Sequence, residues 1–96
     1  MIKKVNDFHA ISDEGFELFS QGRDVWIYSE GDKKIWITRE FAMFREGGGE
    51  YVYLSCLPNH WQSPHETTSI SESKRKQIAD NIQQCLVVLG ARFRAA

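Results

Sequence analysis

The chain has 96 residues, of which 42% are hydrophobic and 12% aromatic. This length fits one domain, and the composition excludes an intrinsically disordered chain. The formal net charge of −1 argues against nucleic acid as the main partner, because phosphate binding needs a surplus of basic side chains. We therefore expect a single folded domain over residues 1–96.

No segment has the features of a targeting or membrane sequence. Residues 1–7 carry charges and lack the apolar region of a secretory signal. The longest apolar run, residues 85–89, has five residues, whereas a membrane helix needs about 20. Cys56 and Cys85 have no CxxC spacing and lie among apolar neighbours, which indicates buried free thiols. These features predict a cytoplasmic protein that does not bind membranes.

The first 56 residues have the pattern of short strands separated by turns. The predicted strands, which are rich in β-branched and aromatic residues, are 16–19, 25–28, 34–38, 41–44 and 50–56. Residues 29–33 are expected to form a hairpin turn. The glycine triplet at 47–49 is expected to be the flexible tip of a second hairpin, because glycines hold regular structure poorly. Consecutive apolar residues in the strands predict one buried face and exposed aromatic side chains on the other.

One helix is predicted near the C-terminus. Ser71 is a suitable N-cap with Ile70 as a hydrophobic staple, and Ser69 is an alternative because a glutamate follows three residues later. Gly90 is expected to end the helix, and residues 91–94 to add a short last strand. Five apolar residues recur at helical spacing and define one stripe, namely Ile78, Ile82, Cys85, Leu86 and Leu89. The sequence thus predicts an α+β fold in which an antiparallel sheet of about five strands packs on one C-terminal helix in two layers.

Residues 57–69 contain both prolines and no periodicity, which predicts a long loop anchored by a buried Trp61. The loop also carries the candidate chemistry of the chain. Cys56, His60, His65 and Glu66 have a spacing that could supply zinc ligands, but neither a paired CxxC nor an HExxH motif supports a metal site. A small metal-dependent or hydrolytic enzyme that uses the loop from His60 to Glu66 is therefore the alternative hypothesis.

Motifs for nucleophilic catalysis are also missing. No Gly-x-Ser-x-Gly sequence is present, and Cys56 lies in a strand-like run where a thiol would be inert. Most of the carboxylates flank turns, as expected for a solvated acidic rim. We therefore predict a protein that is not an enzyme and has no catalytic residues, no metal and no cofactor. A generic adaptor subunit is a further alternative.

The segment from Tyr51 to Gly90 resembles a known family. The run Tyr-Val-Tyr-Leu-Ser-Cys, then Trp61 and Pro64 in a W-x-x-P arrangement, precedes Ile70 and the helix. This pattern resembles the small immunity proteins that are encoded beside bacterial polymorphic and contact-dependent growth-inhibition toxins. The resemblance implies a cytoplasmic antitoxin that binds one cognate toxin C-terminal domain, often a nuclease, one to one and blocks it. It does not supply contact residues.

Charge and aromatic content suggest where a toxin would bind. Residues 1–50 hold ten acidic and seven basic side chains, and a nuclease active site is cationic because it binds phosphate. Carboxylates at hairpin tips can occupy such a site, and an exposed tryptophan can act as a binding hot spot. The predicted partner-binding residues are Glu30 and Asp32 at the first tip, Glu46 and Glu50 at the glycine tip, and Trp26 or Trp36 on the uncovered sheet face.

Overall fold

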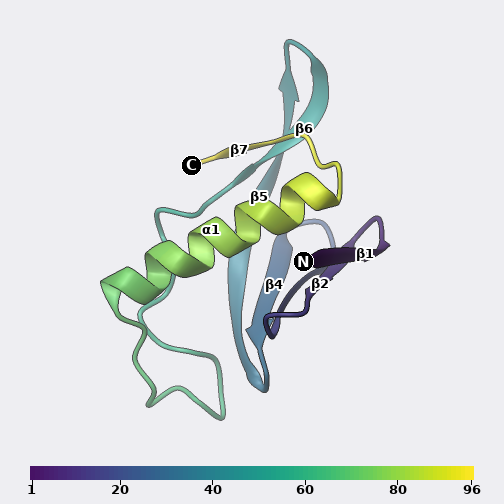
Figure 1. The fold of residues 1–96 in the computed structure, drawn as a ribbon. Coiled ribbons are helices and arrows are strands. Elements are labelled where there is room, and N and C mark those ends of the chain that lie inside the picture. Colours follow the sequence, from purple (N-terminus) through teal and green to yellow (C-terminus); the bar gives the residue numbers. More distant parts are fainter.

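The computed structural model describes all residues, Met1–Ala96, as one sheet and one helix (Figure 1). The elements are β1 (Ile2–Asn6), β2 (His9–Ser12), β3 (Phe16–Ser20), β4 (Val25–Glu30), β5 (Lys33–Phe44), β6 (Gly47–Val52), α1 (Glu72–Val88) and β7 (Phe93–Ala95). The strands lie in chain order across the sheet, and every neighbouring pair is antiparallel except β6 and β7. The predicted α+β class with a C-terminal helix is confirmed, but the sheet has seven strands rather than about five.

The strand count differs because of two features in the first half of the chain. The hairpin of β1 and β2 was not predicted, since its strands are short and β1 is largely polar and exposed. The predicted strands 34–38 and 41–44 form a single strand, β5, in which the polar pair Arg39 and Glu40 separates the two apolar runs. The first half of β5 pairs with β4 and the second half with β6. One long strand therefore joins the two halves of the sheet.

The glycine triplet does not form the hairpin tip. Residues 47–49 belong to β6 and pair with the end of β5, so that the turn consists of Arg45 and Glu46. A methyl group on Gly49 would lie 2.6 Å from the Arg92 carbonyl oxygen and 2.6 Å from the Phe44 ring. The prediction of a flexible glycine tip is therefore wrong, because at Gly49 the missing side chain leaves space for neighbouring groups.

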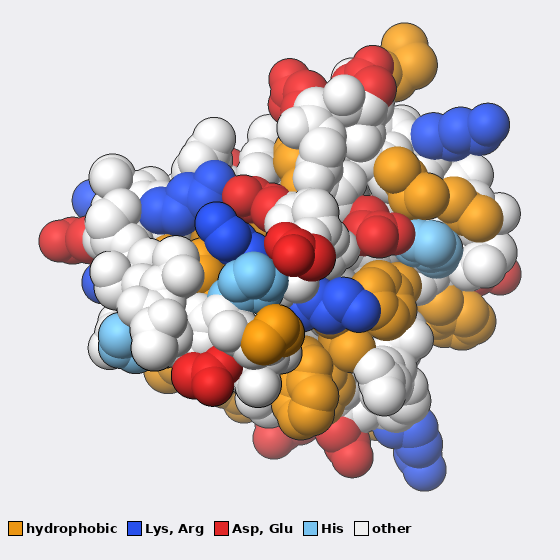
Figure 2. Space-filling view, turned by 90° about the horizontal axis from the view of Figure 1, so that it is seen from below, with side chains coloured by type: hydrophobic (Ala, Val, Ile, Leu, Met, Phe, Trp, Pro, Cys, Tyr) orange, Lys and Arg blue, Asp and Glu red, His pale blue; other side chains and the backbone are white.

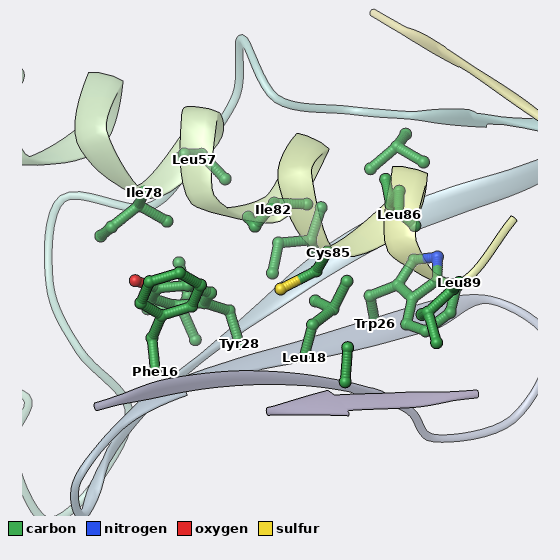
Figure 3. Packing of buried hydrophobic residues seen from close by; sticks show 14 of the residues in the cluster. Phe16, Leu18, Trp26, Tyr28, Leu57, Ile78, Ile82, Cys85, Leu86 and Leu89 are labelled. Atoms are coloured by element: carbon green, nitrogen blue, oxygen red, sulfur yellow. The ribbon is translucent and has the colours of Figure 1, made fainter. Parts of the chain in front are cut away.

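The core lies between the helix and the middle of the sheet (Figure 3). All five residues of the predicted helical stripe are buried. They pack over side chains of β3 and β4 that point toward the helix, including Leu18, Trp26 and Tyr28, and Leu89 lies beside Trp26. The N-cap is Ser71, whose Oγ accepts a hydrogen bond from the Lys74 amide at 3.1 Å. Both the stripe and the preferred cap are confirmed.

Residues 57–69 form the expected long loop, which is pinned to the rest of the molecule. Trp61 is only 5% exposed and belongs to the main core cluster, as predicted. The Gln62 amide donates to the Lys34 carbonyl oxygen at 2.9 Å, so the loop lies along the edge of β5 that β6 leaves open. A bridge between His60 and Ser69 closes the base of the loop. The predicted role of Trp61 as an anchor agrees with this burial.

The two thiols have different environments. Cys85 is buried on the helix, as predicted, and burial raises the pKa of its thiol to about 11. Cys56 is exposed, which corrects the prediction of a second buried thiol. Strand β6 ends at Val52, so Cys56 lies in the turn after the sheet instead of within a strand.

Replacement of Gly49 by alanine should lower the free energy of unfolding by about 2 kcal/mol, because the added methyl group would overlap the backbone of Arg92. Gly48 provides a matched control in the same strand. A methyl group there would meet only the Phe41 ring, at an ordinary 3.5 Å, so Gly48→Ala should change stability by less than about 1 kcal/mol. Urea unfolding of both variants measures the difference, and equal effects would contradict this account of the triplet.

In the native protein, only Cys56 should react quickly with a thiol reagent at pH 8. The raised pKa keeps the Cys85 thiol neutral at this pH. The buried neutral thiol contributes to stability below the ordinary pKa of 9.0, and this contribution is lost as pH rises through about 11. We expect one thiol per chain to react at once and the second only after denaturation. The fast reaction should disappear in Cys56→Ser; two fast thiols in the wild type would contradict the burial of Cys85.

Candidate functional site

Two of the six predicted partner-binding residues lie in the interior. Trp26 is 1% exposed, because the register that pairs it with Ile37 turns its side chain toward the helix. Glu50 is 9% exposed, and its Oε1 accepts a hydrogen bond from Trp26 Nε1 at 2.5 Å. The predicted position of Glu50 at an exposed tip is therefore wrong, and Trp26 is not the outward-facing one of the two tryptophans that were predicted as alternatives. Strand β6 begins at Gly47, so Glu50 lies three residues inside the sheet.

Arg39 completes a polar network around the buried carboxylate. Its Nη2 donates to Glu50 Oε2 at 2.6 Å, and its guanidinium lies 4.2 Å from the centre of the Trp26 ring. Its Nη1 donates to Ser20 Oγ at 2.8 Å, and that hydroxyl donates in turn to the Gly22 carbonyl oxygen. The network links β3, β4, β5 and β6. Sequence reasoning missed Arg39, because its proximity to Glu50 depends on strand register.

Glu30 joins the sheet to the helix. Its carboxylate lies 2.8 Å from Lys74 Nζ and accepts a hydrogen bond from the Tyr28 hydroxyl at 2.5 Å. Asn81 Nδ2 donates to the same hydroxyl at 3.0 Å. Burial, followed by the hydrogen bond to Glu30, raises the pKa of Tyr28 above its ordinary value, so this phenol stays protonated. The internal contacts occupy the Glu30 carboxylate.

Asp32 and Glu46 are exposed, but they lie at opposite ends of the molecule. Asp32 precedes β5 and contacts His65, with 3.1 Å between Oδ2 and Nε2, whereas Glu46 follows β5 and lies 3.5 Å from Arg94. A strand of 12 residues separates them by roughly 35 Å. The predicted carboxylates therefore do not form one surface. Asp32 alone shares one end of the sheet with an exposed tryptophan.

That tryptophan is Trp36, which is 56% exposed. It lies on β5 opposite Ile27, and both side chains point away from the helix, as the alternation with Ile35 and Ile37 requires. Phe19 on β3 lies on the other side of Ile27 in the same row. Figure 2 shows hydrophobic side chains at the surface among charged and histidine side chains on this end of the molecule. Trp36 is therefore the member of the predicted tryptophan pair that faces outward.

A groove of about 490 Å³ opens on the opposite, helix-side face of the sheet, above the network of Arg39 and Glu50. Its apolar walls are Phe8, in the turn between β1 and β2, and Phe41 on β5. The remaining lining residues are Ser20, Gly22, Arg23, Arg39, Gly49 and Glu50. Sequence reasoning missed this groove, because it brings together four segments that are distant in the chain.

The loop histidines do not gather into a metal site. His65 faces Asp32, and no group of three or more His, Cys, Asp or Glu side chains is arranged to hold a metal ion. On the outer sheet face, Glu17 lies between His9 and Ser29, at 2.6 Å from the histidine and 3.3 Å from the hydroxyl. The Ser29 hydroxyl thus donates to the carboxylate, an arrangement that leaves it without a histidine base.

Comparison with known proteins identifies no matching family model, no similar curated protein and no similar solved structure. No helix in the structure combines the length and the apolar character needed to cross a membrane.

Replacement of Glu50 by glutamine should destabilise the protein by about 3 kcal/mol, because it leaves the largely buried Arg39 guanidinium without its counter-charge. Glu46→Gln is the matched control, since Glu46 and Arg94 are both more than half exposed and their attraction is screened by water. Its effect should stay within about 0.5 kcal/mol. Thermal or urea unfolding separates the two variants, and a fully stable Glu50→Gln protein would refute the structural role of the network.

Proposed function

We propose that this protein is a cytoplasmic immunity protein that binds one toxin catalytic domain and neutralises it by covering the active site. Two features support the proposal. The first is the resemblance of residues 51–90 to immunity proteins of toxin systems. The second, on which the choice of surface rests, is the exposure of Trp36 on the sheet face that no helix covers.

An exposed tryptophan on a β-sheet is a suitable anchor for a protein partner. The indole offers a large apolar area on a strand held in place by β4, and burying it in a partner pocket removes that area from water. Phe19, which is partly exposed, lies in the same row beyond the buried Ile27 and adds apolar surface to this face. Because the strands that carry these side chains are already held in the sheet, little backbone entropy is lost on binding.

Asp32 supplies the electrostatic part of this surface. It is 83% exposed in the turn before β5, four residues from Trp36. A carboxylate at that position would attract a cationic nuclease active site and speed the encounter, while the tryptophan would slow dissociation. Glu46 lies too far away to join the same contact and would meet only the periphery of a large partner. Trp26, Glu30 and Glu50 are engaged in contacts within the chain.

The proposal is tested by expressing the chain together with the toxin domain encoded beside its gene and counting surviving cells. The wild type should protect, and Trp36→Ala should bind about 30-fold more weakly, which corresponds to about 2 kcal/mol. Phe41→Ala is the matched control, because Phe41 is also more than half exposed but lies on the opposite face. Asp32→Lys should lower the association rate and its dependence on salt.

Failure of the wild type to protect would contradict the immunity function. Protection by a folded Trp36→Ala protein with unchanged affinity would contradict only the choice of surface. Circular dichroism and unfolding of each variant confirm that a loss of binding does not reflect a loss of structure.

A further inference from the structure

The groove between Phe8 and Phe41 lies outside the surface proposed for the toxin. Phe41 pairs with Glu50 and shares the helix-side face of the sheet, whereas Trp36 is five residues earlier on the same strand and faces the other side. The hairpin of β5 and β6 extends past the helix, which leaves this end of the face uncovered (Figure 1). A ligand in the groove would therefore leave Trp36 itself free, while Phe8 also lines an adjoining pocket that includes Phe19.

The walls of the groove are apolar and solvent-exposed. Phe8 is 58% exposed and Phe41 is 69% exposed. They come from different elements but line the same cavity. Two phenylalanine rings that face water across one groove favour an apolar side chain between them, because its insertion would remove three apolar surfaces from solvent.

The charges of the groove define the other part of the ligand. Glu50 and Arg39 neutralise each other in the floor, and Ser20 is engaged by Arg39 and the Gly22 carbonyl oxygen. The polar groups of the floor are therefore already paired within the chain. Arg23 is the remaining charge that lines the groove, and it forms no ion pair within the chain. The one unpaired charge that lines the groove, on Arg23, is therefore positive.

We propose that this groove binds an extended segment of a second protein partner, distinct from the toxin, in which an apolar side chain stands next to a carboxylate. The apolar side chain lies between Phe8 and Phe41, and the carboxylate receives hydrogen bonds from the Arg23 guanidinium. The segment that binds in this groove must carry a negative charge, whereas a nuclease active site is cationic. This difference in charge separates the contact in the groove from the one at Trp36.

The test titrates the ¹⁵N-labelled chain with two capped peptides, Asp-Leu-Asp-Phe-Asp and its lysine counterpart Lys-Leu-Lys-Phe-Lys. The acidic peptide should shift the amide signals of Gly22, Arg23, Phe41 and Gly49, and the basic peptide should not. Phe41→Ala should weaken the acidic peptide about 30-fold and Arg23→Glu about tenfold, whereas Arg23→Lys should keep part of the affinity. Trp36→Ala, the matched control from the other face, should bind the peptide normally.

Equal shifts with both peptides, a preference for the basic peptide, or unchanged affinity in folded Phe41→Ala and Arg23→Glu proteins would overturn the proposal. Shifts of the same amides on raising the protein concentration alone would identify a second copy as the occupant and would also overturn it. The toxin domain, added to the peptide complex, should not displace the peptide; displacement would place the toxin in this groove. Because the peptide experiment needs no toxin, it stands even if the immunity function fails.

Discussion

The architecture depends on the buried carboxylate of Glu50. It lies in the row where β5 has left β4 and pairs with β6, and it binds the Trp26 indole and the Arg39 guanidinium together. A single carboxylate thereby fixes the two halves of the sheet to each other at the position where the strand pairing changes. An ion pair in this environment is tolerated because both oxygens have donors, which offsets the cost of removing the charge from water.

The length of β5 determines how the surfaces are distributed. Its 12 residues place Asp32 and Glu46 at opposite ends, so the two exposed acidic tips cannot act on one compact target. Its alternation places Trp36 on the outer face and Phe41 on the face of the helix. Two exposed aromatic side chains from one strand therefore lie on opposite faces of the sheet, and each can be substituted without removing the other.

The distribution of charge on the folded protein differs from the one that the sequence suggested. The acidic excess of the first half of the chain suggested one acidic contact surface for a basic partner. Glu30 and Glu50 are used internally, by Lys74 and Arg39 respectively, which leaves Asp32 as the exposed carboxylate near Trp36. In the groove the free charge is positive. Folding thus divides a weak overall acidity into local surfaces of different sign, and these local charges govern which partner can approach.

The local features of this protein could be predicted from its sequence. The helix, its Ser71 cap, its apolar stripe and the Trp61 anchor were predictable, because each depends on neighbouring residues and on a fixed period. Three other features became visible only in the folded chain: which tryptophan faces outward, the burial of Glu50, and the groove that Phe8 and Phe41 share. Those outcomes depend on strand register and on contacts between distant segments, and a shift of one residue in register would reverse which side chains are exposed.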